Sequence, residues 1–353
     1  MKSVYDNWKT VETDADGFAG ANTPEGFRSS YDTIADEGRL ERVYILKGGS
    51  GTGKSTLMHR IASAAEKQGH RCAYYLCGSD PDSLDCVVIG GRIAVLDGTA
   101  PHVREMRIPG ASSAIIDVSR FWDPVKLEPY RNELAQRSAM KSAAYASCTR
   151  WLAAADEVSR ERLALAWRIF DESKARGYIG RFLGRLGKTE PGEARSLWSH
   201  AVTMKGRWRT KTVPGIRTFA VSDYYGTAAV FMNLLNGILT EKQIPHTAYR
   251  LPLTGIIASV HLDTADITVT AVDEEGTAVN MKRFVTESIP DGVRGRIRLT
   301  GEIAHSCLNA AADALTEAAE HHFAVEEIYK PAMDFRALGK YGDTVMREIL
   351  SRL

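Results

Sequence analysis

The stretch GGSGTGKST at residues 48–56 decides the fold. The apolar run VYILK at 43–47 precedes it, and residues 54–68 carry apolar side chains at helical spacing. The pattern predicts a strand, a glycine-rich loop and a helix. Closely spaced glycines let backbone N–H groups face one concavity, and the helix N-terminus adds a favourable dipole for anions. The stretch is therefore typical of a phosphate-binding loop, the Walker A pattern.

Residue types within this loop predict separate roles in binding a nucleoside triphosphate. The ammonium group of Lys54 is expected to bridge the β- and γ-phosphates, and the hydroxyl of Ser55 is expected to ligate Mg²⁺. We expect a continuous run of residues to form the nucleotide site: Gly48, Gly49, Ser50, Gly51, Thr52, Gly53, Lys54, Ser55 and Thr56.

An acid at the end of a neighbouring strand is expected to hold a Mg²⁺-bound water. Asp97 closes the run IAVLD and is our first candidate, both as a metal residue and as a catalytic residue. Asp117 closes the shorter run AIID and is the alternative.

An acidic segment at 79–85 follows the predicted strand at 72–77. Asp80 and Asp82 are catalytic candidates there, because a carboxylate can orient a water or an acceptor hydroxyl. The alternative is that they cap a short helix into which this loop opens.

Thr99 and His102 follow Asp97 and are candidates to face the γ-phosphate, although a structural role is the preferred interpretation for the histidine. Three arginines are candidates to neutralise charge in the transition state: Arg104, Arg107 and Arg120.

Alternation of strands and helices predicts an α/β fold of mostly parallel sheets with helices on both faces. Further strands are expected at 92–98 and 112–117, and the helical pattern changes character after residue 123. We expect three parts along the chain: a P-loop NTPase domain at 1–123, a helical subdomain at 124–196, and a second domain at 197–353.

The second domain resembles the first when the sequence is shifted by 175 residues, which predicts a duplicated P-loop domain. Gly51-Thr52 then falls on Gly226-Thr227, but Lys54 falls on Ala229 and Ser55 on Val230. At a shift of 180, Thr23–Gly26 falls on Thr203–Gly206. We therefore expect one intact nucleotide site and one degenerate copy.

Composition favours a cytoplasmic protein. The chain has 45 basic and 44 acidic side chains, five cysteines without C-x-x-C spacing, and no apolar run that would span a membrane. Two basic stretches that contain aromatic residues, 174–188 and 205–211, indicate possible nucleic-acid contact, although a solvated surface is the preferred interpretation. No cysteine and histidine cluster has zinc spacing.

Several segments together resemble a family of tandem P-loop ATPases from Gram-positive bacteria, also described as nucleotide-kinase-like and without a defined physiological role. These segments are GFAGANTPEGF, VYILKGGSGTGKSTLMHRI, CGSDPDSLD, IAVLDGTAPH and EIYKPAMDF. The similarity is close over 18–123 and loose beyond it. It implies ATP binding at residues 48–56, with Asp97 and the acidic segment nearby. Members of that family usually carry an intact loop in both halves, and this sequence departs from them at 223–230.

The sequence therefore predicts a Mg²⁺-dependent ATPase with one active site, acting with an unknown protein partner or a small-molecule acceptor. A small-molecule or nucleotide kinase is the first alternative. A non-catalytic nucleotide-sensing or nucleic-acid-binding module is the second.

Overall fold

The computed structural model describes residues 3–187, 190–213, 215–272, 275–286 and 288–353. Its centre is a mixed sheet of 12 strands. In the order in which they lie side by side, these are β17 (Thr277–Asn280), β13 (Arg217–Ser222), β16 (Ile267–Thr270), β15 (Ile257–Leu262), β14 (His246–Arg250), β10 (Ala194–Trp198), β2 (Gly17–Phe18), β6 (Cys72–Leu76), β7 (Leu84–Ile89), β8 (Ile93–Asp97), β5 (Arg42–Lys47) and β9 (Ser113–Asp117).

The sheet consists of two six-stranded halves that meet at β2 and β10 through one antiparallel pair, Phe18 opposite Trp198. From this junction outward, the first half (β2, β6, β7, β8, β5, β9) pairs parallel, antiparallel, antiparallel, parallel and parallel. The second half (β10, β14, β15, β16, β13, β17) pairs in the same sequence. The predicted α/β class is confirmed, and the sheet is mixed.

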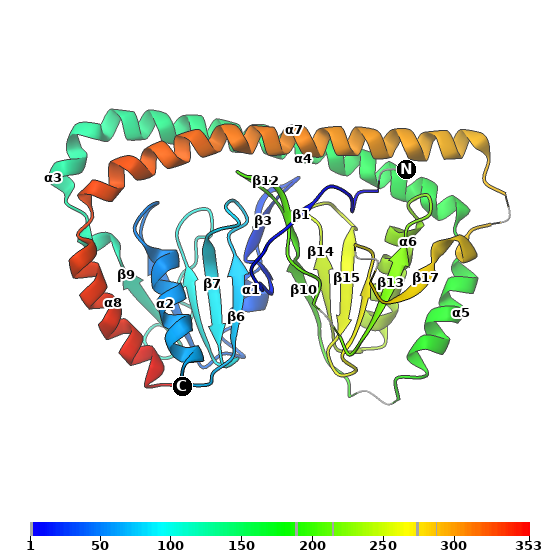
Figure 1. Ribbon diagram of the computed structural model, residues 1–353, viewed down its shortest axis with the longest axis horizontal. Coiled ribbons are helices and arrows are strands. Elements are labelled where there is room, and N and C mark those ends of the chain that lie inside the picture. The colour runs from blue at the N-terminus through cyan, green and yellow to red at the C-terminus, as the bar shows by residue number, and fades with distance from the viewer. Residues whose placement is uncertain (1–2, 188–189, 214, 273–274, 287) are drawn as a thin grey trace.

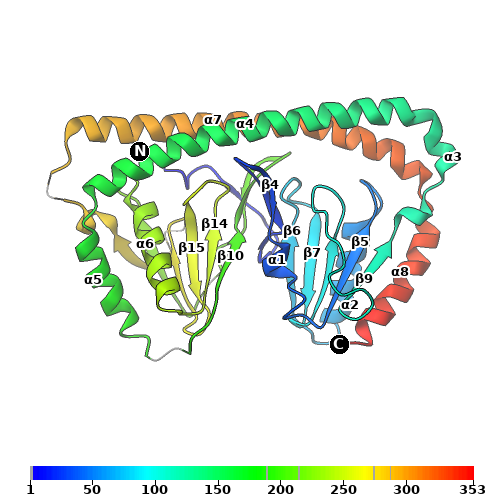
Figure 2. The same ribbon diagram turned by 180° about the vertical axis from the view of Figure 1, so that it is seen from behind.

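Helices cover both halves and join them (Figure 1). The helices are α1 (Tyr31–Ile34), α2 (Lys54–Glu66), α3 (Pro124–Leu127), α4 (Arg131–Ile169), α5 (Glu172–Leu183), α6 (Thr227–Glu241), α7 (Asp291–Tyr329) and α8 (Phe335–Leu350). The long helices α4 and α7 lie side by side in opposite directions across the whole molecule, as the view from behind also shows (Figure 2). A membrane crossing would need a longer or more apolar helix than any within the described ranges.

Each long helix begins in one half and ends in the other. Backbone hydrogen bonds join the start of α4 to the end of α7 in the first half, where Asp123 N–H donates to the Ala332 carbonyl at 2.8 Å. At the other end, Thr286 N–H donates to the Ile169 carbonyl at 2.9 Å. As a result α8, from the predicted second domain, packs on α2 of the first half.

The predicted helical segment 124–196 is helical as far as Leu183. Its final residues enter β10, so the predicted limit between 196 and 197 lies inside a strand. Residues 188–189 of this segment lie outside the described residues.

Strand β5 lies between β8 and β9 and is buried on both faces. Tyr44 and Leu46 pack in the cluster that contains α2 and α8, whereas Val43 and Ile45 pack with α1 residues on the opposite face. A strand that is covered on both sides reads as a continuous apolar run, which explains why VYIL was recognisable in the sequence. This strand fixes the start of the glycine-rich loop.

One predicted element was wrong. Residues 79–85 were expected to form a loop that opens into a short helix, but Leu84 begins β7, an antiparallel strand between β6 and β8. All six residues of β7 are buried, and Gly90 and Gly91, both at positive φ, turn the chain back into β8. An apolar run before a Gly-Gly pair is a hairpin signal, and burial in the sheet outweighed the helix-capping residues upstream.

Two small hairpins flank the junction of the halves. They are β3 (Gly20–Thr23) with β4 (Gly26–Ser29), and β11 (His200–Thr203) with β12 (Gly206–Arg209), which also pairs with β1 (Lys9–Thr10). The Thr23 hydroxyl donates to the Gly26 carbonyl at 2.7 Å, and the Thr203 hydroxyl donates to the Gly206 carbonyl at 2.9 Å. The four-residue segments that align at a shift of 180 thus have the same turn geometry.

Candidate functional site

The glycine-rich loop, residues 48–53, joins β5 to α2, so the predicted strand, loop and helix are confirmed. Gly51 and Gly53 have φ values of 71° and 80°, in the left-handed region that glycine adopts without steric cost. Gly53 is the N-cap of α2, and no side chain caps the helix. The first N–H groups of α2 are therefore available to an anion at the loop.

Lys54 lies over the loop that precedes it. Its ammonium group donates to the carbonyls of Gly48 and Gly49 at 2.9 and 2.7 Å and lies 3.4 Å from a carboxylate oxygen of Asp97. Only 10% of the Lys54 side chain is exposed. The cation is thus held at the mouth of the loop, where it can interact with a bound phosphate.

Asp97 ends β8, which pairs in parallel with β5. One oxygen of its carboxylate accepts a hydrogen bond from the backbone N–H of Thr99 at 2.8 Å, and the other faces Lys54. Burial raises the pKa of Asp97, Lys54 opposes this rise, and the nearby Asp85 adds to it. Asp97 therefore lies beside the loop as predicted.

Asp117, the alternative to Asp97, lies elsewhere. It ends β9, and its exposed carboxylate accepts hydrogen bonds from the N–H and the hydroxyl of Ser119 at 2.9 and 2.5 Å. It is not among the residues that line the cleft at the loop. Of the two acids, Asp97 has the position that the sequence argument requires.

The hydroxyl of Ser55 accepts a hydrogen bond from the Leu84 backbone N–H at 3.0 Å, which ties the first turn of α2 to β7. Ser55 and Asp97 both line the cleft. A hydroxyl and a carboxylate are hard oxygen donors, the kind that Mg²⁺ prefers. This donor set fits the magnesium ion that the sequence predicts.

The loop opens into a cleft of about 940 Å³ whose far wall comes from the two long helices. Polar residues on α4 line it at helical spacing, and the end of α7 contributes a second group. The α4 residues are Ser138, Lys141, Ser142, Tyr145 and Thr149, and the others are His322, Glu326 and Lys330. This wall was not predicted from the sequence, although its α4 residues form a polar stripe along one helix face.

The cleft wall contains basic side chains from both long helices and from the residue that follows α7: Lys141, His322 and Lys330. Burial lowers the pKa of Lys141, and the Glu326 carboxylate partly opposes this effect. Glu326 itself lies 3.4 Å from both the His322 imidazole and the Lys330 ammonium group. Within the described part of the chain, Lys141 makes no direct hydrogen bond or ion pair, so its ammonium group is available to a ligand.

Asp85 and His102 form a buried pair at the base of the cleft. Their carboxylate oxygen and Nε2 atom are 2.7 Å apart, and about 6% and 5% of the two side chains are exposed. The Tyr31 hydroxyl lies within hydrogen-bonding distance of the Asp85 and Asp97 carbonyls, at 3.1 and 2.7 Å, which links the ends of two strands. Asp85 belongs to the acidic segment 79–85, in which only Asp80 and Asp82 were named as candidates.

The predicted candidates Asp80 and Asp82 are paired instead with Lys205, whose ammonium group donates to each carboxylate at 2.6 Å. Asp80 lines the cleft, whereas Asp82 does not and has a side chain that is 75% exposed. The two carboxylates therefore connect the first half to the β11–β12 turn. Among the acids of this segment, Asp85 is better placed for a role in the cleft, because it lines the cleft and pairs with His102.

Other predicted residues divide between the cleft and the surface. Thr99 lines the cleft and donates its hydroxyl hydrogen to the Gly48 carbonyl at 2.6 Å. Arg104 pairs with Asp32 at 2.6 Å and Arg107 with Asp36 at 3.7 Å. Arg120 lies over the rings of Phe121 and Tyr341, and none of the three arginines lines the cleft.

We predict that the pair Asp85–His102 stabilises the fold most at acidic to neutral pH. Burial disfavours the charged imidazole, but Asp85, and to a lesser extent Asp97, more than compensate, so the pKa of His102 is raised above its ordinary value of 6.5. Lys54 acts in the opposite direction. A raised folded-state pKa gives stability that is fully present below about pH 6.5 and is lost as the pH rises through the folded value.

His102→Asn should therefore lower the free energy of unfolding by more at pH 6 than at pH 9, as denaturant titrations can measure. The exposed His59 offers a matched control, because His59→Asn should give the same small change at both pH values. Equal losses at both pH values for His102→Asn would contradict a charged imidazole.

The corresponding loop of the second half joins β13 to α6 and is closed by its own side chains. Gly226, with φ of 82°, is the N-cap of α6, as Gly53 is of α2. The Asp223 carboxylate accepts hydrogen bonds from the N–H groups of Gly226 and Ala228 at 3.2 and 3.0 Å. Arg162 of α4 lies 3.6 Å from the same carboxylate, and the cavity there is about 10 Å³.

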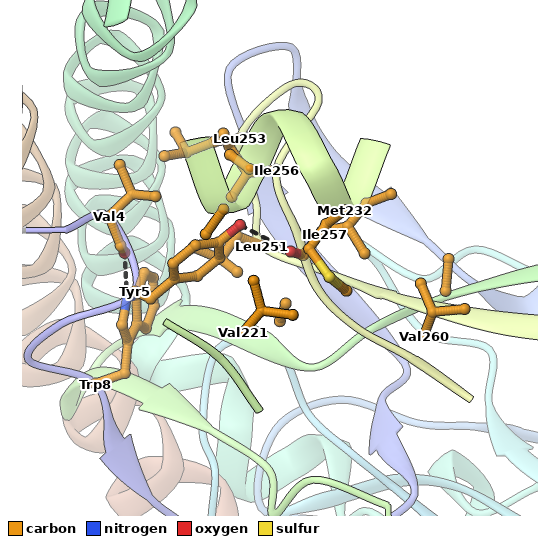
Figure 3. Close-up of a cluster of buried hydrophobic side chains, with 14 of the residues drawn as sticks. Val4, Tyr5, Trp8, Val221, Met232, Leu251, Leu253, Ile256, Ile257 and Val260 are labelled. Atoms are coloured by element: carbon orange, nitrogen blue, oxygen red, sulfur yellow. Dashed lines mark hydrogen bonds between the residues drawn. The ribbon is translucent and has the colours of Figure 1, made fainter. Parts of the chain in front are cut away.

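The chain's N-terminal segment completes this closure. Tyr5 is buried and donates its hydroxyl hydrogen to the Ile257 carbonyl at 2.9 Å. Figure 3 shows Val4, Tyr5 and Trp8 gathered against second-half side chains that include Val221 and Leu251. An internal carboxylate and a packed segment thus occupy the place that a nucleotide would need.

Comparison with known proteins gives one partial match. The family model for the domain described as Nephrocystin 3, N-terminal matches residues 27–87, a stretch that contains the glycine-rich loop and α2. No match is found among curated proteins or among solved structures. The matched stretch is well under half of the chain, so it indicates a local similarity only. Membership in a tandem P-loop ATPase family stays a prediction.

Proposed function

We propose that the chain is a Mg²⁺-dependent ATPase with one working nucleotide site, in the cleft at the glycine-rich loop. The observation that carries this proposal is the contrast between the halves. In the first half, Lys54 and Asp97 lie at a cleft of about 940 Å³. In the second half, Asp223 takes the N–H groups of the loop and leaves about 10 Å³.

In the proposed reaction, the N–H groups of the loop and of the first turn of α2 bind the phosphate chain. Lys54 exchanges its contacts with the Gly48 and Gly49 carbonyls for contacts with the terminal phosphates, which neutralises charge as the phosphoryl group is transferred. Asp85, which lines the same cleft and pairs with His102, is the residue that would accept a proton from the attacking water.

Ser55 and Asp97 are the residues that would hold magnesium in this site. The ion would supply charge neutralisation between the β- and γ-phosphates. The Thr99 N–H and Lys54 orient the Asp97 carboxylate, so this acid keeps its position beside the loop before the nucleotide binds.

Internal duplication of a P-loop domain is part of the proposal. Its support is the common order and polarity of the strands in the two halves, together with the two Thr–Gly turns. The hydrogen bonds at the ends of α4 and α7 are also equivalent under a shift of 163 residues, which places Asp123 on Thr286 and Ile169 on Ala332. The bond from Asp123 N–H to the Ala332 carbonyl then has its counterpart in the bond from Thr286 N–H to the Ile169 carbonyl. The second copy would then be a closed domain that packs against α4 and α7.

Lys141 is the residue on the far wall that we expect to contribute most to turnover. Its ammonium group makes no direct hydrogen bond or ion pair within the described ranges, and a cation opposite the loop would stabilise charge on the transferred phosphate. Lys141→Ala should lower kcat by about 10²-fold, measured by phosphate release under saturating Mg-ATP. Lys126→Ala, at an exposed lysine of α3, is the control. Unchanged kcat for Lys141→Ala would contradict a role for the α4 wall in catalysis.

A kinase is the second candidate, favoured by one observation. The cleft extends beyond the loop to the hydroxyl groups on α4 and contains the Asp85–His102 pair, which would suit an acceptor alcohol as well as water. The acceptor would then lie between the loop and α4.

Product analysis by ³¹P NMR separates the two functions. The protein is incubated with Mg-ATP alone and with a pool of nucleosides, nucleoside monophosphates and small hydroxyl compounds. Inorganic phosphate as the sole new product supports the ATPase. A new phosphate ester that is absent with Lys54→Ala identifies a kinase and its acceptor, and no ATP consumption in either mixture would contradict both functions.

A further inference from the structure

A second concave site lies in the second half, away from the cleft. It is a cavity of about 230 Å³ between α5, β13 and the turn that follows β17. Four arginines and three aromatic residues line it, with Leu186: Arg181, Arg185, Arg217, Arg283, Tyr178, Phe182 and Phe219. No acidic side chain is among these lining residues. This group of residues is called the arginine pocket below.

The arginines come from three separate elements, so the fold brings their charges together. Arg181 lies in the last turn of α5 and Arg185 lies two residues beyond the end of that helix, Arg217 begins β13, and Arg283 lies in the turn Met281–Phe284. Arg283 lies 5.1 Å from the Tyr178 ring centroid. Across the described residues, none of these four arginines forms an ion pair with a carboxylate.

At the corresponding place in the first half, between α8 and β5, the arginine side chains have partners within the protein. Glu348 of α8 accepts a hydrogen bond from the Tyr44 hydroxyl at 3.0 Å and lies 3.7 Å from Arg352. Arg42, at the start of β5, donates to the carbonyls of Gly110 and Ala111 at 2.5 and 2.9 Å. Within the described residues, a cluster of four arginines without a carboxylate partner is thus found at this place in the second half and not in the first.

The two basic stretches of the sequence also differ in their use. In 205–211, Lys205 pairs with Asp80 and Asp82, and Lys211 pairs with Asp14 at 2.6 Å. The stretch 174–188 instead supplies α5 and two arginines of the pocket; its last residue, Lys188, lies outside the described residues. The lysines of 205–211 thus form ion pairs within the protein, whereas the arginines of 174–188 that line the pocket have charge available for a ligand.

We propose that the arginine pocket binds a nucleoside monophosphate or a phosphorylated small molecule with a similar planar ring. Guanidinium groups donate paired hydrogen bonds to phosphate oxygens, and several of them compensate more than one negative charge. The Phe182 and Phe219 rings, 5.2 Å apart in an edge-to-face arrangement, offer an apolar surface for a planar ring. The small volume favours one nucleotide unit over a polymer.

Isothermal titration calorimetry of the full chain with AMP, GMP, CMP and UMP, and separately with inorganic phosphate, tests this proposal. At least one monophosphate should bind, and Arg217→Glu should weaken its affinity by 10-fold or more. Phe219→Leu should weaken binding of that monophosphate but not of inorganic phosphate. Arg176→Ala is the matched control, because Arg176 lies on the same helix but pairs with Glu172 outside the pocket.

Binding that Arg217→Glu and Arg185→Glu leave unchanged would overturn the proposal, since the monophosphate would then occupy the cleft of the first half. A complete lack of binding at millimolar concentration would also overturn it. A single-stranded oligonucleotide that binds more tightly than every monophosphate, with a steep salt dependence, would replace it with a nucleic-acid surface. Because none of these variants touches the glycine-rich loop, the result is independent of ATP turnover.

Discussion

Replacement of Lys54 by alanine should reduce ATP turnover at least about 10³-fold, the largest effect that we expect of any single substitution. The ammonium group lies within 3.4 Å of Asp97 and donates to two loop carbonyls, so it is fixed where the terminal phosphates would bind. Its removal leaves the transferred charge without its nearest cation. The measurement is phosphate release at saturating Mg-ATP.

Two further variants sharpen this test. Lys67→Ala removes an exposed lysine just beyond α2 and should leave turnover unchanged. Adding Ala229→Lys to the Lys54→Ala protein should restore nothing, because Asp223 would still occupy the N–H groups of the second loop. A reduction of less than about 10-fold in the Lys54→Ala protein would contradict a single working site at this loop.

Replacement of Asp97 by asparagine should lower turnover by about 10²–10³-fold and raise the Mg²⁺ concentration needed for half-maximal rate. The substitution keeps the shape of the side chain but removes the carboxylate that lies beside the loop and Lys54. Turnover is measured as a function of Mg²⁺ concentration at fixed ATP.

Asp117→Asn is the matched control for Asp97→Asn. Both acids end strands that pair in parallel with β5, yet Asp117 is exposed and its carboxylate is bonded to Ser119. The control should retain full turnover and an unchanged Mg²⁺ requirement. Loss of turnover in Asp117→Asn with none in Asp97→Asn would mean that Asp117, and not Asp97, is the acid that holds Mg²⁺.

The glycine-rich loop and its neighbouring strand could be read from the sequence because their signals are local. The run before Gly48 is continuous and apolar since β5 is buried on both faces, and Gly51 and Gly53 have the positive φ that their spacing indicated. Asp97 was predicted for the same reason, since it follows a buried strand directly.

Features that depend on distant parts of the chain were not predicted. Lys141 and Glu326 reach the cleft because α4 and α7 cross between the halves, and no local pattern reveals which helix covers which loop. Asp80 and Asp82 were named in place of Asp85 because the sequence did not show that strand β7 begins at Leu84 and buries Asp85 beside His102. The loss of the loop glycines at 223–230 was visible, but the closure by Tyr5 comes from the other end of the chain.

The number of nucleotides bound per chain distinguishes one working nucleotide site from two. Native mass spectrometry with Mg²⁺ and a slowly hydrolysed ATP analogue counts them on the intact protein, with the Asp97→Asn variant beside it. One nucleotide per chain is expected in the cleft, with markedly lower occupancy in Asp97→Asn. Two nucleotides per chain that persist when Arg217→Glu disrupts the arginine pocket, or none, or one that Asp97→Asn holds equally, would contradict a single working site.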